Sequence, residues 1–266
     1  MTAGIIQTEL HLGDIDSNIG SATRMIVDCI NNSKPDLLVL PEVFATGFPY
    51  GRLKELAKRS GDVIGALSDL SSEHSVNIFF TQVVEEDSCF YNRSFHLGRD
   101  GKIKGVYDKT HLFSRSGEDR FFTPGDHLTM FRMDDVPIGP LICYEVRFPE
   151  LSRKLVFEGA QLLIYPAQWP SFRTFQWETL LRARAIENQC FVIGTNVYGD
   201  HGGSMMGGRS RIFSPFGNVI ASVDDGEGWS TCLLNPEEMY SLREKIPVLK
   251  ESRPDIDLRK DLFTYP

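Results

Sequence analysis

The 266-residue chain is long enough to bury a large core, and its 41% hydrophobic and 24% charged residues exclude a disordered protein. A formal net charge of -8 argues against nucleic acid or an anionic membrane as a partner. The five cysteines are odd in number and form no CxxC pair, so neither a disulfide framework nor a zinc site is expected. With no export signal and no bilayer-spanning apolar run, the sequence predicts a cytoplasmic protein.

The first half of the chain shows strand and helix patterns in alternation, followed by a hairpin. Its expected elements are a strand at 3–9, a helix at 17–32, a strand at 36–40, a helix at 63–74, and extended segments at 76–84, 90–97 and 102–107. The last two segments are separated by a Gly-Arg-Asp-Gly turn at 98–101. This order is typical of a sheet covered by helices on one face.

The second half repeats that order. Its expected elements are a strand at 137–143, a helix at 150–158, a strand at 161–166, a helix at 175–189, a strand at 190–196, and a hairpin formed by 209–214 and 218–223. Two similar sheets, each covered by helices, predict an α/β protein with a four-layer αββα sandwich in one domain spanning 1–266. The glycine-rich segment 202–208 is interpreted as a mobile surface loop.

The end of the chain has its own pattern. A helix is expected at 237–245, followed by a charged stretch and the apolar residues 261–266. Such an apolar end needs a surface to pack against. We therefore interpret 236–266 as a C-terminal extension that packs on a partner subunit.

A glutamate follows directly after the second predicted strand. The buried run 37–40 stops at Pro41, which places Glu42 beyond the carboxyl end of the strand, where open α/β folds bind their ligands. Taken alone, an acid at such a place is more often a solvated turn residue or a helix cap. The role of Glu42 therefore depends on what the fold brings beside it.

A cysteine stands at the equivalent place in the second half. The buried run 138–142 ends at Cys143, and residues 144–150 then turn the chain into a helix. A thiol near a helix start has its thiolate stabilised by the local dipole, which favours attack on an acyl carbon. Taken alone, a free cysteine is more often a small buried core residue.

One lysine closes the extended segment 102–107. Lys109, if placed near a carboxylate and a thiol, can stabilise both a thiolate and an oxyanion, although a turn lysine is usually solvated. If the strand continued this far, alternation would point the side chain of His111 to the same face as that of Lys109. A Cys–His pair is the more familiar activated thiol, but we interpret His111 as a buried structural histidine in the site wall, since Glu42, Lys109 and Cys143 account for the chemistry.

Three further charged residues have structural interpretations from spacing alone. Glu118 precedes the turn at 123–126 and is read as an ordinary loop acid. Arg184 and Glu187 are three residues apart on the predicted helix 175–189, a spacing typical of a same-face ion pair.

Three short segments occur together in an order that points to one known family. They are Pro41 with Glu42, the run Asp-Lys-Thr-His-Leu-Phe at 108–113, and the run Ile-Cys-Tyr-Glu-Val-Arg-Phe-Pro-Glu at 142–150. In these segments, and also in 183–189 and 209–217, the sequence resembles the nitrilase superfamily of carbon–nitrogen hydrolases. The resemblance covers nearly the whole chain and implies an αββα fold and a homodimer.

The resemblance also implies roles for individual residues. It makes Cys143 the nucleophile, Glu42 the general base, Lys109 the catalytic lysine, and Glu118 an additional glutamate that positions substrate and lysine. The implied reaction is attack of the thiol on an amide carbon, with Lys109 and the backbone N–H of Tyr144 holding the oxyanion. Ammonia leaves, and water hydrolyses the thioester. No metal ion and no organic cofactor are implied.

Within the superfamily, residues 143–150, 168–170 and 183–190 are most similar to the ω-amidase branch, which hydrolyses 2-oxoglutaramate and related short amides. One departure is Glu145, where aspartate is expected. The resemblance thus implies a small-molecule amide as substrate.

A dicarboxylic monoamide needs a cation for its distal carboxylate, and three arginines are candidates: Arg147, Arg173 and Arg209. Arg147 is equally suited to brace the turn after Cys143. We place Trp169 as a pocket wall and Arg173 as the anion contact.

Other reactions remain open. A nitrilase or an N-carbamoyl amino acid hydrolase would use the same Glu-Lys-Cys set, so pocket residues must separate these substrates. A catalytically silent dimeric scaffold is the alternative of another class. It would be expected to have lost at least one of the three residues, because buried charges are costly to keep without purpose.

Overall fold

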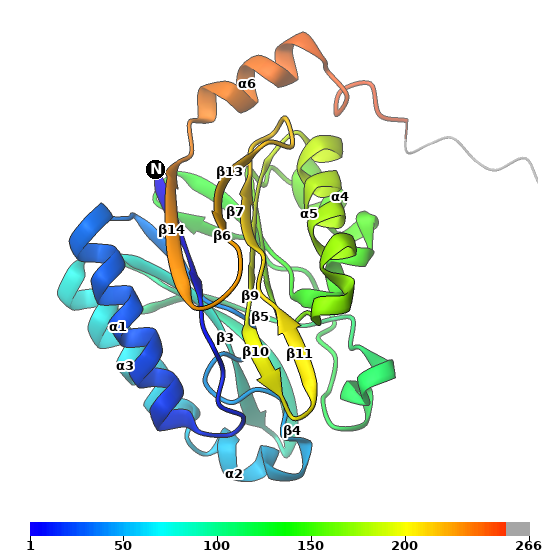
Figure 1. Ribbon diagram of the computed structural model, residues 1–266. Helices are drawn as coiled ribbons and strands as arrows, with labels where there is room; N and C mark the ends of the chain where they lie inside the picture. The colour runs from blue at the N-terminus through cyan, green and yellow to red at the C-terminus, as the bar shows by residue number, and fades with distance from the viewer. Residues whose placement is uncertain (254–266) are drawn as a thin grey trace, which may run out of the picture.

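A computed structural model describes residues 1–253 and contains two six-stranded sheets with helices on their outer faces (Figure 1). The predicted four-layer αββα sandwich is confirmed. The apolar residues 261–266, which the sequence analysis assigns to a partner contact, lie outside the described residues.

The first sheet is mixed and has the strand order β14-β1-β2-β3-β4-β5. Its strands are β1 (Thr2–Gln7), β2 (Leu37–Val39), β3 (Asn77–Glu86), β4 (Cys89–Leu97), β5 (Ile103–Asp108) and β14 (Gly228–Leu233). Strands β1, β2 and β3 are parallel neighbours because helices connect them, whereas β3, β4 and β5 are antiparallel and joined by short turns. The predicted turn at 98–101 connects β4 to β5.

The second sheet has the order β13-β12-β9-β8-β7-β6. Its strands are β6 (Phe131–Met133), β7 (Val136–Pro140), β8 (Leu162–Ala167), β9 (Phe191–Asn196), β12 (Ser210–Phe213) and β13 (Val219–Val223). Here β7, β8 and β9 run parallel, again because helices connect them. A separate hairpin, β10 (Tyr198–His201) with β11 (Ser204–Gly207), follows β9.

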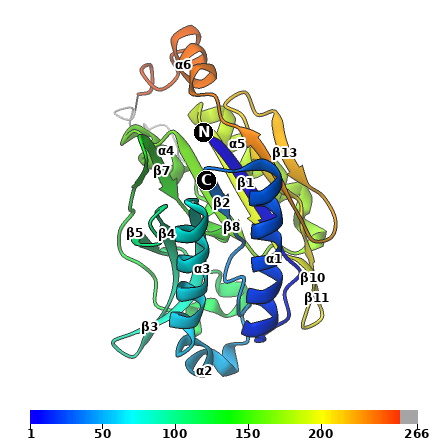
Figure 2. The same ribbon diagram turned by 90° about the vertical axis from the view of Figure 1, so that its left-hand side faces the viewer.

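The helices lie on the outside of the two sheets. They are α1 (Ile15–Ser33), α2 (Leu53–Ala57), α3 (Ser60–His74), α4 (Pro149–Phe157), α5 (Thr174–Asn188) and α6 (Pro236–Lys245). Figure 2 shows α1 and α3 side by side over the first sheet, while α4 and α5 cover the second sheet in Figure 1. The part of the chain that the structure describes also has five short 3-10 helices: η1 (Tyr50–Arg52), η2 (Ser114–Ser116), η3 (Glu118–Arg120), η4 (Cys143–Arg147) and η5 (Ser171–Arg173).

Strand alternation divides the apolar side chains between two layers of core. In β1, Ile5 faces the cluster between the two sheets, whereas its neighbour Ile6 faces the cluster beneath α1 and α3. Leu38 and Val39 divide in the same way in β2. Because both faces of these strands are buried, the strands are continuous apolar runs rather than alternating ones, as parallel strands typically are.

The glycine-rich segment 202–208 is not the mobile surface loop that was predicted. Most of it belongs to the β10–β11 hairpin, and Met206 is buried against Leu10 and Val197. No strand was predicted at 131–133 or 228–233, which are β6 and β14. Both are edge strands. β6 has three residues, too few for its buried–exposed–buried alternation to be recognised, and β14 is half-exposed along most of its length.

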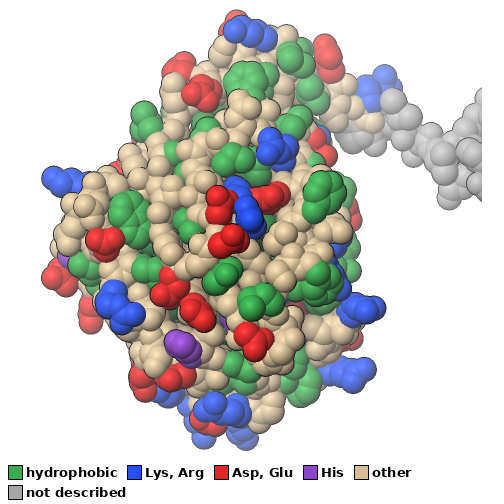
Figure 3. Space-filling view, in the orientation of Figure 1, with side chains coloured by type: hydrophobic (Ala, Val, Ile, Leu, Met, Phe, Trp, Pro, Cys, Tyr) green, Lys and Arg blue, Asp and Glu red, His purple; other side chains and the backbone are tan. Residues whose placement is uncertain are grey.

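Charges of both signs are interspersed over the surface, as Figure 3 shows for one face. This agrees with a net charge spread along the sequence. Within residues 1–253, no helix is long and apolar enough to cross a bilayer.

One buried histidine gives the fold a pH dependence. His96 in β4 is 1% exposed and stacks on Phe131, with its Nε2 3.3 Å from Oδ1 of Asn77. Burial, with a smaller contribution from Lys104, lowers its pKa from 6.5 to about 4, even though Asp134 opposes that shift. Between these values the unfolded chain binds a proton that the native protein excludes. Stability from this group is therefore present above pH 6.5 and lost as the pH falls toward 4.

We expect His96→Gln to reduce the loss of unfolding free energy between pH 7 and pH 5 by about 1–2 kcal/mol. Urea unfolding at the two pH values measures this difference. His127→Gln, which removes an exposed histidine, serves as the matched control. Equal pH dependence in the His96 variant and the unmodified protein would contradict the assignment.

Candidate active site

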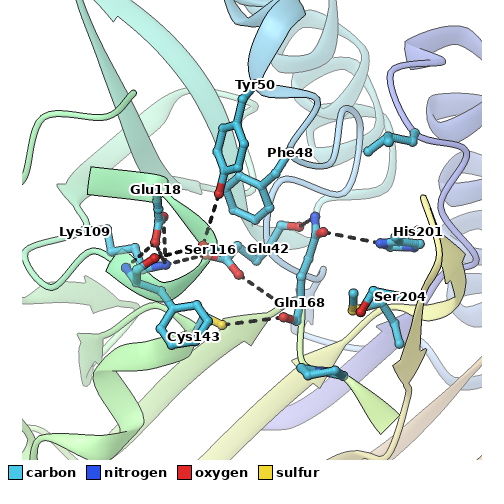
Figure 4. A pocket seen from close by; sticks show the side chains of 14 residues that line it. Glu42, Phe48, Tyr50, Lys109, Ser116, Glu118, Cys143, Gln168, His201 and Ser204 are labelled. Carbon is cyan, nitrogen blue, oxygen red and sulfur yellow. Dashed lines mark hydrogen bonds and ion pairs between the residues drawn. The ribbon is translucent and has the colours of Figure 1, made fainter. Parts of the chain in front are cut away.

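Three strands end close together and bring the predicted residues to one edge of the sandwich. Glu42 lies just beyond β2, Lys109 follows the last residue of β5, and Cys143 lies just beyond β7. Figure 4 shows these side chains converging on one cavity. The three residues singled out from their positions after strands are thus brought together by the fold.

Lys109 lies between two carboxylates. Its Nζ is 2.9 Å from Oε1 of Glu42 and 2.9 Å from each carboxylate oxygen of Glu118, and all three side chains are at most 2% exposed. Burial alone would lower the pKa of Lys109, but the charges of Glu118 and Glu42 hold it well above the ordinary value. The lysine is therefore a fixed cation held between two carboxyl groups.

Glu42 accepts hydrogen bonds on both of its oxygens. Oε1 accepts from Lys109 and from Nδ2 of Asn92 at 2.7 Å, and Oε2 accepts from the backbone N–H of Gln168 at 2.9 Å. Burial raises the pKa of Glu42, with Glu118 adding to that shift, while Lys109 opposes it. A carboxylate with a raised pKa is suited to take up and return a proton.

Cys143 occupies a strained backbone position. It is the first residue of η4 and has a φ of 48°, a left-handed conformation that costs a non-glycine residue about 1–3 kcal/mol. The predicted strand 137–143 is correspondingly wrong at its end, because β7 stops at Pro140. The thiol is 8% exposed and lies 3.9 Å from the carbonyl oxygen of Gln168.

The surroundings of Cys143 act against the thiolate, which the start of the following helix was expected to stabilise. Burial, together with the charge of Glu42, raises the pKa of this thiol well above its ordinary value, and Lys109 only partly offsets the shift. The resting site therefore holds a neutral thiol beside a carboxylate, so attack needs a base.

Glu118 is not the exposed loop acid that its spacing indicated. It is 2% exposed, ion-paired with Lys109, and accepts a further hydrogen bond from the backbone N–H of Phe113 at 2.7 Å. Asn92 Nδ2 lies 3.3 Å from its Oε1. Loop residues 113–118 thus fold back over the lysine, which no local pattern reveals.

A cavity of about 270 Å³ opens in front of these groups. Its far wall comes from the β10–β11 hairpin through His201, Ser204 and Met206, and Phe48 and Tyr50 line another side (Figure 4). His201 is 8% exposed, and burial lowers its pKa to about 4, so it is neutral near pH 7. The cavity combines a polar base with mostly apolar walls, as small-molecule sites typically do.

A side pocket of about 30 Å³ adjoins the cavity at Cys143. Its walls include Tyr144, Arg147, Trp169 and Arg173, so the predicted pocket residues do meet here. The guanidinium of Arg147 lies 4.9 Å from the ring centre of Trp169, whose Nε1 donates to the backbone oxygen of Arg173 at 2.8 Å. Within residues 1–253, neither arginine forms an ion pair.

Two sequence expectations about charged residues near the site are wrong. Arg209 is not available as an anion contact, because it pairs with Asp224 at 3.2 Å and with Asp225 at 3.5 Å. His111 is half-buried rather than buried, does not line the cavity, and packs against Phe148 with the two rings tilted and their centres 4.2 Å apart.

The predicted ion pair between Arg184 and Glu187 is confirmed at 2.7 Å. Arg184 also donates from Nε and Nη2 to the carbonyl oxygen of Val146, at 3.0 and 2.8 Å. Helix α5 thereby braces the turn that carries Cys143.

Two residues that contact Glu42 were not singled out from the sequence. Asn92 faces into the site from β4, and Gln168 follows β8 and donates from its side chain to the carbonyl oxygen of Glu42 at 2.8 Å. Asn92 could have been found as a polar residue on the inward face of a predicted strand. Gln168 could have been found because it follows the end of a predicted strand, as Glu42 and Cys143 do.

Comparisons with known proteins agree on one family. The profile of the family described as carbon-nitrogen hydrolase matches residues 2–244. A 2-oxoglutaramate amidase of Bacillus subtilis (strain 168) is 35% identical over 98% of this chain and 99% of its own length. The omega-amidase YafV of Escherichia coli (strain K12) is 33% identical, with coverage of 82% and 84%. The crystal structure of Saccharomyces cerevisiae Nit3, a member of branch 10 of the nitrilase superfamily, superposes with a TM-score of 0.88 at 25% identity, covering 94% of this chain and 96% of that one.

Proposed function

The chain belongs to the carbon–nitrogen hydrolase family and is an amide-hydrolysing enzyme, and we propose that it is an ω-amidase acting on 2-oxoglutaramate or similar dicarboxylic monoamides. The observation that carries the proposal is the buried contact of Glu42 and Glu118 with Lys109 at the edge where Cys143 lies. Similarity to a 2-oxoglutaramate amidase supports the choice of substrate.

The first step is attack of Cys143 on the amide carbon. Because burial keeps the thiol protonated, the proton must leave as the C–S bond forms, and the neighbouring Glu42 carboxylate accepts it. A base with a raised pKa holds that proton long enough to return it. Glu42 then gives it to the departing nitrogen, and ammonia leaves.

The oxyanion forms between a cation and a backbone donor. Lys109 supplies a charge fixed by two carboxylates, and the N–H of Tyr144, the residue after the nucleophile, supplies the second donor. Glu118 keeps the lysine protonated and oriented, since it contacts Nζ through both oxygens. A preorganised pair of this kind needs no rearrangement when the negative charge develops.

The thioester is resolved by water. Glu42, again a carboxylate after ammonia has left, takes a proton from the water that attacks the acyl carbon. The C–S bond then breaks, Glu42 returns the proton to the sulfur of Cys143, and the free acid leaves with the thiol restored. No step in this sequence requires a metal ion or an organic cofactor.

The side pocket gives the substrate its proposed orientation. Arg147 and Arg173 line it without carboxylate partners within residues 1–253, and the pocket begins at Cys143. A substrate with its amide at the thiol can therefore place a distal carboxylate beside one or both guanidinium groups. Trp169 forms the wall between them.

The domain organisation, the cellular location and the homodimer are also proposals. We take residues 1–266 as one catalytic domain that acts in the cytoplasm and forms a homodimer, with 236–266 as the segment that meets the partner. Exposed apolar side chains at the start of α5, Phe172 in η5 and Phe175, support a protein contact at that end of the helix, which is the end away from α6.

The test is ammonia release from purified protein with 2-oxoglutaramate, succinamate, glutamine, N-carbamoyl amino acids and simple nitriles. Turnover of 2-oxoglutaramate or succinamate supports the ω-amidase. Turnover confined to carbamoyl or nitrile substrates keeps the mechanism and replaces the substrate class. No turnover of any of these compounds would favour an amide outside this panel or the silent scaffold.

Arg173→Gln tests the anion contact. We expect its KM for succinamate to rise about 10- to 100-fold, because a charge-assisted hydrogen bond contributes about 1.5–3 kcal/mol, while its kcat/KM for a neutral short amide stays near that of the unmodified enzyme. Steady-state kinetics on both substrates measure the difference. Arg24→Gln, which removes an exposed arginine from α1, is the control for lost charge. Parallel changes on the charged and neutral substrates would rule out an anion contact at Arg173.

A further inference from the structure

A third glutamate near the nucleophile is buried and is not needed for the chemistry described above. Glu145 lies two residues after Cys143 in η4 and is 0% exposed. One of its oxygens, Oε2, accepts from the backbone N–H of Ile142 at 2.6 Å. The N–H of Glu145 itself donates to the carbonyl oxygen of Ile142 at 3.0 Å. These two bonds close a ring around the strained Cys143.

The other oxygen of Glu145 reaches the segment that carries the lysine. Oε1 accepts from the hydroxyl of Tyr107 at 2.6 Å, from Oγ1 of Thr110 at 2.6 Å and from the backbone N–H of Thr110 at 2.8 Å. The backbone N–H of His111 is also 3.2 Å away. The donors come from both sides of Lys109 along the chain.

The many donors favour an ionised carboxylate. Burial would raise the pKa of Glu145, but hydrogen bonds from His111, Thr110, Tyr107 and Ile142 lower it below the ordinary value. The imidazole Nδ1 of His111 is 3.9 Å from Oε1 and is a partner of opposite charge when it is protonated. A neutral amide at this place would bring N–H groups against some of these donors.

We propose that Glu145 is a positioning residue that holds the turn of Cys143 in register with Lys109. Within residues 1–253 the hydrogen bonds between the two segments all go to Glu145, and the ring contacts of His111 with Phe148 and of Phe113 with Tyr144 add no polar link. The strands that carry the segments lie in different sheets, β5 in the first and β7 in the second. The oxyanion contacts of Lys109 and of the Tyr144 N–H must converge on one carbonyl oxygen, so a small shift between the segments separates them. The inference rests on the proposed roles of Cys143 and Lys109.

The test compares Glu145→Gln with Glu145→Asp. We expect Glu145→Gln to lower kcat about 100-fold with little change in KM, because misplacement by about 1 Å can have that effect. Glu145→Asp keeps the charge on a shorter side chain, and its kcat should exceed that of the glutamine variant by at least about tenfold. Glu158→Gln, at the exposed end of α4, controls for loss of one negative charge.

A second readout separates positioning from general damage. Alkylation of Cys143 by iodoacetamide needs the thiol and its base but no oxyanion site. In Glu145→Gln, alkylation should therefore stay within about threefold of the unmodified rate while kcat falls about 100-fold. The inference is overturned if Glu145→Gln has unchanged kcat, if the Gln and Asp variants are equally impaired, or if alkylation and kcat fall together.

Variants on the lysine side keep the test informative if Glu145→Gln does not fold. Tyr107→Phe and Thr110→Val each remove one hydroxyl donor to Oε1 and leave the carboxylate in place. Each variant should lower kcat with little change in KM, and the double variant should lower kcat further. Full activity of the double variant would overturn the link. Failure of the proposed function is distinguishable, since it would leave the unmodified enzyme without amidase activity.

Discussion

Replacing Cys143 with alanine is expected to lower kcat for 2-oxoglutaramate or succinamate by at least about 10⁴-fold, as loss of a covalent nucleophile does in other hydrolases. The physical reason is that no other nucleophile in the cavity has the base Glu42 to activate it. Ser116 and Ser204 line the same cavity. Neither hydroxyl has a hydrogen bond to Glu42 within residues 1–253.

The measurement is ammonia release, combined with mass spectrometry for an acyl adduct of the unmodified protein. Thermal unfolding should change little, since alanine removes a single buried sulfur. Cys89→Ala is the matched control, because Cys89 is a half-buried thiol at the start of β4 and away from the cavity. Activity retained by Cys143→Ala and lost in Cys89→Ala would reverse the assignment of the nucleophile.

Replacing Glu42 with glutamine is expected to lower kcat by about 10²–10⁴-fold, the usual contribution of a general base. Glutamine is nearly the same size and still offers one oxygen to Lys109 and Asn92. It cannot take the thiol proton, and its amide group meets the N–H of Gln168, which loses an acceptor. Loss of that hydrogen bond should also reduce the unfolding free energy by about 1–3 kcal/mol.

The pH profile identifies Glu42 as the base. Since burial raises its pKa above 4.5, activity of the unmodified enzyme should be lost as the pH falls through a value above 4.5, where the carboxylate becomes protonated. In Glu42→Gln this acid limb should disappear from the residual activity. Glu73→Gln, an exposed acid on α3, is the control. An unchanged acid limb in Glu42→Gln would assign it to another group.

Much of the fold could be predicted because its central strands are buried on both faces. Such strands appear in the sequence as continuous apolar runs, so the order of β1, β2, β7, β8 and β9 followed from local pattern alone. By contrast, β14 is half-exposed at the edge of the first sheet, and its pairing with β1 depends on a partner more than 200 positions away. The local sequence pattern of β14 therefore cannot identify β1 as its partner.

The candidate site divides in the same way. Glu42 and Cys143 follow the ends of predicted strands, so their convergence could be expected from topology. Glu118 reaches Lys109 only because residues 113–118 fold back over the lysine, and its burial had no signal in its neighbours. The pKa of Cys143 also escaped prediction, because it depends on depth of burial and on the charge of Glu42 rather than on the helix that follows.

The pairing of β14 with β1 also determines when the first sheet can finish folding during protein synthesis. The register joins Thr2 to Leu233, and the terminal amine lies 3.4 Å from the carbonyl oxygen of Leu234. A ribosome must therefore synthesise the more than 200 residues that separate β1 from β14 before β1 finds its outer neighbour. Until then one edge of β1 has unpaired backbone groups, and such edges pair readily with other chains. A pause in translation between β1 and β14 should consequently lengthen the dependence on chaperones, whereas a pause after β14 should not.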